Sequence, residues 1–181
     1  MNAPLSEHGS LQAQQLAQHL SSQATLTAIF SSPFHRTLST AHQVAKATGC
    51  PVFVEYALAE WAKKAVLPPL AFDAAYFSQF PLVSPSYAPA VPFHAIPGHS
   101  ETPQGIHQRA QQLVRRVEVE FTEGDILFVG HAASCVAVTR ALLRDEEAHL
   151  APGACSLTKL SRRKGEGWKL EYGCDVSFLE G

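Results

Sequence analysis

Short apolar runs that alternate with amphipathic helical patterns are the feature that most restricts the fold of this chain. The strand-like runs occupy residues 26–32, 51–54 and 126–129. Helical apolar spacing covers residues 10–22, 33–48, 103–121 and 132–143. Two later runs joined by a Gly-rich turn, residues 156–162 and 168–172, indicate paired antiparallel strands at one edge. We therefore predict an α/β sandwich of three layers around a mostly parallel sheet.

Start and stop signals flank these predicted helices. Ser32 is placed to cap the second helix, and Pro33 suits its first turn. Gly49 is the stop signal of the same helix. Thr102 and Pro103 give the third helix the same kind of start.

Length and composition predict a single folded domain over residues 1–181. Apolar residues make up 46% of the chain and charged residues 17%, with a net charge of −2. These values exclude a wholly disordered chain, a coiled coil and a collagen-like repeat. The charge balance argues against nucleic acid as a partner. No apolar run approaches the ~18 residues that a membrane span needs, so we expect no membrane association.

Cysteine usage indicates the compartment. Cys50, Cys135, Cys155 and Cys174 are scattered and form no C-x-x-C pair, which argues against a disulfide framework and against a zinc site. The first residues lack the basic and apolar regions of a secretory signal. We therefore predict a reducing, cytoplasmic location and no metal.

Residues 66–103 differ from the rest of the chain. They hold eight of the twelve prolines, a density at which we expect no regular element to survive. A solvated linker is one interpretation, but Phe72, Tyr76, Phe77 and Phe93 are poor linker residues. We favour a long excursion that packs on the domain as a lid or pocket wall.

Two junctions between a strand and the following helix carry groups suited to an anion. Residues 31–36 read S-S-P-F-H-R, and residues 129–134 read V-G-H-A-A-S. Ligands bind beyond the carboxyl ends of parallel strands, where helix N-termini favour anions. Arg36 supplies a permanently charged fork, and His131 a group that titrates near neutral pH. Either residue alone also fits a surface or structural role, so the prediction depends on their combination.

The segment S-S-P-x-x-R-x-x-x-T-A at residues 31–41 resembles a signature of the histidine phosphatase superfamily, which includes cofactor-dependent phosphoglycerate mutase. V-G-H-A-A-S resembles the second-histidine motif of that superfamily. V-E-Y-A-L-A-E-W at residues 54–61 resembles the acid-bearing segment of the branch with the suppressor-of-T-cell-receptor-signalling phosphatases. A-P-L-S-E-H-G-S-L-Q-A at residues 3–13 resembles a further family segment. The resemblance covers essentially the whole chain and implies a phosphoglycerate mutase-like fold.

The resemblance implies roles for particular residues. Arg36 and His131 would bind the transferred phosphoryl group, and His131 would stabilise its developing charge. Glu60 would be the general acid that protonates the leaving alcohol. Its apolar neighbours predict partial burial and a raised pKa for this carboxyl. Glu101 and Arg109 fit a structural support at the start of a helix. No metal or other cofactor is implied.

One motif of the superfamily is absent from this sequence. The family's nucleophile is a histidine in an Arg-His-Gly motif that ends the first strand, and no Arg-His-Gly occurs here. His8 precedes Gly9, but it aligns with a helix start instead of the nucleophile. The missing strand is central in the family's sheet, so the strand at residues 126–129 would expose unpaired backbone groups. We therefore expect this sequence to be an N-terminally truncated form of a longer phosphatase.

Two functions of different classes follow. The first is phosphomonoester hydrolysis through a phosphohistidine intermediate, in a full-length protein that contains the nucleophile. The alternative is an inactive pseudophosphatase that binds phosphate or a phosphoprotein through Arg36 and His131. A phosphoglycerate mutase fits less well, because the Ala-Glu-Trp segment and the proline-rich excursion resemble the phosphatase branch. The expected partner is a phosphorylated small molecule or phosphoprotein, and the resemblance permits a homodimer.

Overall fold

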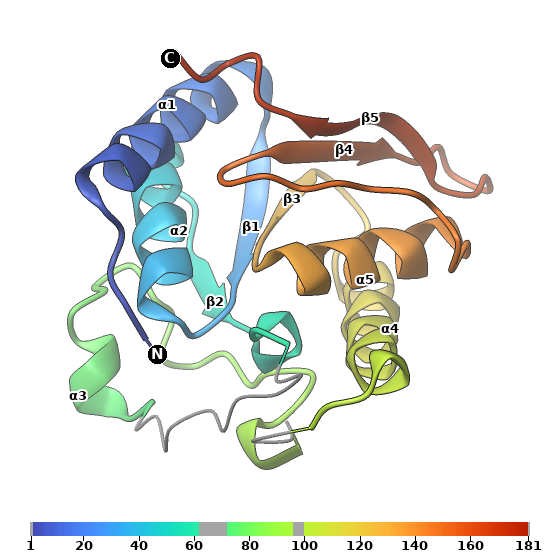
Figure 1. Ribbon diagram of the computed structural model, residues 1–181, viewed down its shortest axis with the longest axis horizontal. Coiled ribbons are helices and arrows are strands. Elements are labelled where there is room, and N and C mark those ends of the chain that lie inside the picture. The colour runs from blue at the N-terminus through green and yellow to red at the C-terminus, as the bar shows by residue number, and fades with distance from the viewer. Residues whose placement is uncertain (1, 62–71, 96–99, 181) are drawn as a thin grey trace.

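The computed structural model describes residues 2–61, 72–95 and 100–180 (Figure 1). In chain order, its α-helices are α1 (Glu7–Gln23), α2 (His35–Thr48), α3 (Ala74–Phe77), α4 (Pro103–Glu120) and α5 (Ala132–Leu143). Its strands are β1 (Leu26–Ser31), β2 (Val52–Val54), β3 (Asp125–Val129), β4 (Leu157–Ser161) and β5 (Lys169–Asp175). Two 3-10 helices are η1 (Tyr56–Leu58) and η2 (Phe93–Ala95). The predicted alternation of strands and helices is confirmed.

Three parallel strands form the central sheet in the order β2-β1-β3. Ile29 of β1 lies opposite Val52 of β2 and opposite Leu127 of β3. The helices α1 and α2 lie on one side of this sheet, and α4 and α5 lie on the other (Figure 1). The chain therefore has the three-layer α/β fold that the sequence predicts.

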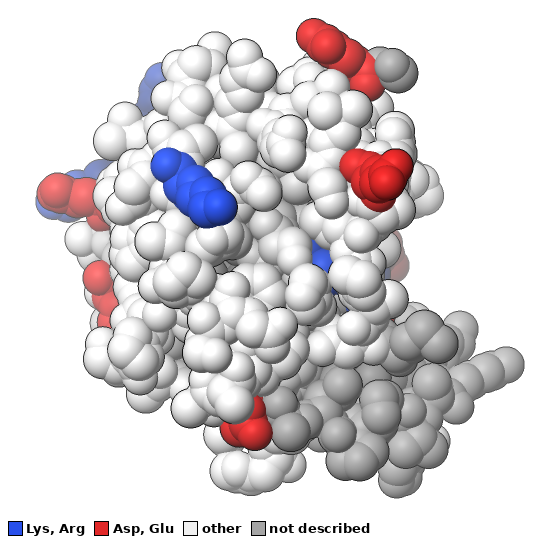
Figure 2. Space-filling view, turned by 90° about the vertical axis from the view of Figure 1, so that its left-hand side faces the viewer, with Lys and Arg blue, Asp and Glu red and all other residues white. Residues whose placement is uncertain are grey.

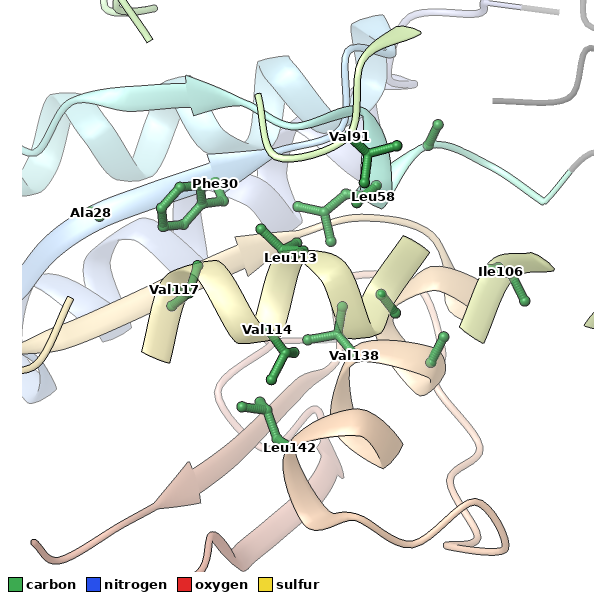
Figure 3. Packing of buried hydrophobic residues seen from close by; sticks show 14 of the residues in the cluster. Ala28, Phe30, Leu58, Val91, Ile106, Leu113, Val114, Val117, Val138 and Leu142 are labelled. Carbon is green, nitrogen blue, oxygen red and sulfur yellow. The ribbon is translucent and has the colours of Figure 1, made fainter. Parts of the chain in front are cut away.

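Alternate side chains of β1 supply two hydrophobic layers. Ala28 and Phe30 pack with α4 and α5, where Leu113 and Val117 meet them (Figure 3). Ile29 points to the opposite face and packs with α1 and α2. This alternation follows from the two-residue period of a strand. Full burial of such a side chain contributes ~1.5–3 kcal/mol, so both layers hold the sheet in place.

Two helix starts differ from the prediction. The helix α1 begins at Glu7 instead of residue 10, because the Ser6 side chain caps it by accepting a backbone hydrogen bond. The N-cap of α2 is Phe34, which makes no side-chain capping bond, so the prediction that Ser32 caps this helix is wrong. Gly49 ends α2 in the left-handed conformation with φ of 72°, as predicted.

The strands β4 and β5 form an antiparallel hairpin of their own, so the prediction that they extend the parallel sheet is wrong. Within the described residues, β3 pairs with β1 alone and shares no backbone hydrogen bond with the hairpin. Yet Leu157 packs on the layer of α1 and α2, while Leu160 packs on that of α4 and α5. The hairpin thus contacts both layers, as a strand of the same sheet would.

The described part of the proline-rich segment, residues 72–95, folds back on the domain. Phe80 is buried in the layer of α1 and α2, and Val91 in the layer of α4 and α5. The short helix α3 corrects the prediction that no regular element survives here, because Asp73 caps it by accepting from a backbone N–H. Residues 66–71 and 96–99 of the predicted excursion lie outside the described residues.

Glu55 anchors this segment to the end of β2. Its carboxylate is fully buried and accepts from the Tyr87 hydroxyl at 2.9 Å and from the Ala90 N–H at 2.8 Å. The N–H groups of Ala57 and Val91 donate to the other oxygen at 3.1 and 3.3 Å. Burial and the neighbouring Glu55 carboxylate raise the pKa of Tyr87, which keeps its hydroxyl a donor. A buried carboxylate is tolerated because donors satisfy both of its oxygens.

The face formed by α1 and α2 carries few charged side chains (Figure 2). Those visible on its described part stand apart from one another and build no basic patch. Long-range attraction of a polyanion to this face is therefore weak. No helix in the described ranges is long and apolar enough to cross a bilayer.

Replacement of Glu55 by alanine should destabilise the fold strongly. The change leaves the Tyr87 hydroxyl and three backbone N–H groups without their acceptor. Each unsatisfied buried donor costs ~1–3 kcal/mol, so we expect the free energy of unfolding to fall by about 3 kcal/mol or more in urea titrations. The matched control is Glu120→Ala, because Glu120 forms an exposed pair with Arg116. A loss of stability as small as that of the control would contradict the anchoring role.

Candidate functional site

The three predicted site residues come from the segments that follow the three parallel strands. Arg36 lies in the first turn of α2, after β1. Glu60 follows η1, which comes after β2, and His131 is the N-cap of α5, after β3. Because the strands are parallel, their carboxyl ends meet at one edge of the sheet. The structure therefore brings together residues that are far apart in the sequence.

The Arg36 guanidinium joins the other two side chains. Its Nη2 atom lies 3.0 Å from Glu60 Oε2 and 2.9 Å from His131 Nδ1. Glu60 Oε2 and His131 Nδ1 are 3.2 Å apart. A guanidinium nitrogen only donates, so Nη2 gives one hydrogen to the carboxylate and one to the ring. This contact assigns Nδ1 of His131 as an acceptor.

Ser32 occupies the other side of the His131 ring. Its fully buried hydroxyl oxygen lies 2.9 Å from Nε2. Since Nδ1 accepts from Arg36, a neutral ring carries its proton on Nε2 and donates it to Ser32. The ring is thereby held at both nitrogens. The sequence assigned Ser32 to helix capping, and its position in the same junction as Arg36 was the signal for this role.

Ser134 connects the segment before Glu60 with the start of α5. Its hydroxyl accepts from the backbone N–H of His131 at 3.0 Å and donates to the Leu58 carbonyl at 2.9 Å. Gly130 makes room for this arrangement, because a Cβ atom there would lie 2.7 Å from Ser134 Oγ. Ser134 belongs to the V-G-H-A-A-S segment, but no role was predicted for its hydroxyl.

Arg109 and Glu101 hold the backbone segment that contains Glu60 in place. They form a buried bidentate pair, with Nε 2.7 Å from Oε1 and Nη2 3.0 Å from Oε2. Arg109 also donates to the carbonyls of Ala57 and Glu60. The geometry agrees with the structural role that the sequence indicated for this pair. It fixes the backbone that presents the Glu60 carboxylate.

The pKa of Glu60 differs from the prediction. Burial opposes its ionisation, as expected, but contacts with His131, the Trp61 N–H and Arg36 outweigh burial and lower the pKa to about 2. The expectation of a raised pKa is therefore wrong for this arrangement, because the sequence did not reveal which groups from other elements surround the carboxyl. Burial also lowers the pKa of His131, against the opposing effect of Glu60. Burial thus disfavours the protonated, charged form of the ring.

Aromatic side chains border the site. The Phe34 ring lies under the Arg36 guanidinium, with 5.0 Å between the Cζ atom and the ring centroid. The same ring meets His131 edge to face at 5.0 Å and packs against Phe72 at 5.9 Å. Phe34 therefore links the charged groups to the proline-rich segment. Sequence reasoning missed this residue, although it precedes Arg36 in the junction.

The arrangement is chemically suited to exchange the Glu60 carboxylate, an anion of the protein itself, for an anion from solvent. The charges of Arg36 and Glu60 cancel, and their side chains are 30% and 39% exposed, so solvent reaches both. His131 is only 4% exposed, and its ring presents Nδ1 to the same place. His8 lies in the first turn of α1, where the resemblance had placed it. Within the described ranges, no group of three His, Cys, Asp or Glu side chains is arranged to hold a metal ion.

Several solved structures share this fold. Ecdysone phosphate phosphatase from Bombix mori, in complex with tungstate, superimposes with a TM-score of 0.76. It has 21% sequence identity, and the match covers 98% of this chain and 74% of that one. A mycobacterial glucosyl-3-phosphoglycerate phosphatase with inorganic phosphate gives a TM-score of 0.72 at 22% identity, over 99% of this chain and 91% of that one. At these identities the similarity shows the fold alone, and it is the phosphoglycerate mutase-like fold that we predicted.

Sequence comparisons give the family. A relative from Saccharomyces cerevisiae, the transcription factor tau 55 kDa subunit, is 31% identical over 177 residues. That match covers 87% of this chain, which spans only 40% of the yeast protein. The finer assignment to the suppressor-of-T-cell-receptor-signalling branch stays a prediction. The family model of the histidine phosphatase superfamily (branch 1) matches residues 1–175, and the chain therefore belongs to the histidine phosphatase superfamily.

Proposed function

We propose that this chain provides the phosphoryl-binding part of a phosphomonoesterase that works through a phosphohistidine. The observation that carries the proposal is the meeting of Arg36 Nη2 with His131 Nδ1 at 2.9 Å and with Glu60 Oε2 at 3.0 Å. Charged hydrogen bonds of this kind contribute ~1.5–3 kcal/mol each. Similar structures that hold tungstate or inorganic phosphate support a tetrahedral anion as the ligand.

Each residue has a role in the proposed reaction. Arg36 and His131 hold the phosphoryl oxygens, while the ring nitrogen of a histidine outside this sequence attacks phosphorus. As the N–P bond forms, the ester P–O bond breaks, and a proton from Glu60 passes to the leaving alcohol oxygen. Water then attacks phosphorus, the N–P bond breaks and Glu60 recovers a proton. The products are an alcohol and inorganic phosphate.

The open edge of β3 supports the place of the absent nucleophile. This edge has no partner strand among the described residues, and the hairpin beyond it contacts both hydrophobic layers. A strand that entered between β3 and β4, parallel to β3, would end at the edge where Arg36 and His131 lie. An Arg-His-Gly sequence at the end of that strand would place its histidine beside them. We propose that such a strand comes from polypeptide outside these 181 residues.

The proline-rich segment is part of the same proposal, as the wall that contacts the alcohol portion of the substrate. Phe72 lies against Phe34 at 5.9 Å, and Phe93 lies against Phe72 at 5.4 Å. Phe93 is 44% exposed, so an aromatic surface extends from the charged groups towards solvent. This surface favours an alcohol with apolar area.

An inactive phosphate-binding module is the second candidate. Two observations favour it, namely the absence of Arg-His-Gly and the yeast relative, which is named as a transcription factor subunit. In this reading Arg36 and His131 bind a phosphorylated partner inside a larger assembly. The site geometry is compatible with both candidate functions, and a measurement of turnover distinguishes them.

Phosphate binding should depend on Arg36. We expect inorganic phosphate to raise the thermal unfolding temperature of the wild type and to have little effect on Arg36→Ala, which lacks the donor to the anion. Differential scanning fluorimetry over a phosphate titration measures this. Arg116→Ala is the matched control, because Arg116 is equally exposed and forms an ion pair on α4. An equal phosphate effect in all three proteins would contradict the site.

Turnover should appear when the absent strand is supplied. We would add a synthetic peptide of alternating apolar residues that ends in Arg-His-Gly and measure hydrolysis of p-nitrophenyl phosphate. We expect the histidine peptide to exceed a His→Ala peptide by about 100-fold or more, because only the former has a nucleophile.

The same assay distinguishes the two candidate functions. Peptide binding without hydrolysis, followed by phosphate protection that still requires Arg36, would reject catalysis in favour of the binding module. Hydrolysis that persists with the His→Ala peptide would reject the phosphohistidine route.

A further inference from the structure

We propose that Glu60 takes up a proton when a tetrahedral dianion binds to Arg36 and His131, so that this carboxyl becomes an acid only in the complex. The inference rests on the proposed phosphoryl site. It adds the source of the proton that the leaving alcohol receives.

The Glu60 carboxylate occupies the position of a ligand in the free site. Its Oε2 accepts from Arg36 Nη2, the same atom that donates to His131 Nδ1. A dianion bound to Nη2 and the His131 ring would bring its oxygens against Oε2, which is already 3.2 Å from Nδ1. Two charged acceptors in contact repel each other unless a proton lies between them. Either Glu60 leaves, or it becomes the donor of that hydrogen bond.

The charges around Glu60 favour the uptake of a proton when the dianion binds. Among the described residues, Arg36 from α2 is the cation paired with Glu60, while Arg109 from α4 is neutralised by its buried pair with Glu101. With Glu60 ionised and His131 neutral, the described site sums to zero charge. A dianion brings this sum to −2, and one proton from solvent reduces it to −1. The step converts a carboxylate and a proton to a carboxylic acid and changes no other bond.

Glu60 receives this proton more readily than its neighbours. His131 is enclosed by Ser32 and Arg36 at its two nitrogens, and burial disfavours its charged form. The buried thiol of Cys135 on α5 keeps its proton, because burial raises its pKa to about 11. Glu60 has a 39% exposed side chain, so water delivers a proton to it directly.

The contacts of Glu60 also permit the exchange. Its Oε1 accepts from the Trp61 N–H at 3.1 Å, and this bond remains when Oε2 gives up Arg36. The protonated Oε2 then faces the bound anion. The carboxyl therefore reaches the position of a general acid without a change in the backbone that Arg109 holds.

The sign of the pH dependence follows. The carboxyl is ionised in the free protein above its pKa of about 2, and the bound dianion raises that pKa. Between the two pKa values, binding consumes one proton, so affinity is highest at low pH and falls about tenfold for each pH unit of increase. Above the raised pKa, the dependence on this group ends.

Sulfate is the probe, because it remains a dianion without titrating from about pH 5 to about pH 7.5. Isothermal titration calorimetry at constant ionic strength measures its affinity and, in buffers of different ionisation enthalpy, the protons taken up. For the wild type we expect an affinity loss of about tenfold per pH unit and uptake of about one proton.

Glu60→Gln should remove the effect. The amide carries no charge and supplies the hydrogen-bond donor permanently. We expect this variant to bind sulfate more tightly than the wild type near pH 7, with no proton uptake. Glu120→Gln is the matched control, because Glu120 lies in α4 and forms an exposed pair with Arg116. The sulfate affinity of this variant should depend on pH as that of the wild type does.

Three results would overturn the proposal. A wild-type affinity that does not change with pH shows that no proton is taken up. Uptake that persists in Glu60→Gln assigns the proton to another group. Weaker binding by Glu60→Gln at every pH shows that the carboxylate assists the anion instead of competing with it. By contrast, sulfate binding that is unaffected by Arg36→Ala removes the proposed phosphoryl site itself.

Discussion

Parallel pairing of β1 with both of its neighbours is the interaction on which the rest of the structure depends. Ser31 at the end of β1 lies opposite Val54 of β2 and opposite Val129 of β3. The segments that follow the three strands therefore leave the sheet at the same level, which brings Arg36, Glu60 and His131 together. A register slip of one residue would turn each strand's side chains to the other face, so the two hydrophobic layers also fix the site.

Buried hydrogen bonds then hold these segments at contact distance from one another. Ser134 joins the start of α5 to the Leu58 carbonyl, and Arg109 joins α4 to the carbonyls of Ala57 and Glu60. Both act on the short segment after β2, which has little regular structure of its own. Such ties hold functional side chains within a narrow range of geometries. The position of Glu60 is thus set by α4 and α5, the two helices on one side of the sheet.

The sequence predicted what is periodic or local, and it failed where a distant neighbour decides. Spacing of apolar residues gave the core of α4, and motif resemblance named Arg36 and His131, which the structure places in contact. The partner of Ser32 is 99 residues away, so a capping role was the local inference and it was wrong. The pKa direction of Glu60 failed for the same reason, because two of its stabilising partners come from other elements.

Internal pairing gives the site a selectivity that a bare arginine would lack. Any anion that binds Arg36 must displace Glu60 from Nη2 or protonate it, so binding is a competition between two acceptors. A monovalent ion such as chloride offers one weakly directed contact and does not replace a carboxylate held at 3.0 Å. In the proposed complex, a phosphoryl group offers several charged oxygens, enough for Arg36 and His131 together. The carboxylate therefore raises the threshold for every anion, and under the proposed function a phosphoryl group is the anion best able to pass it.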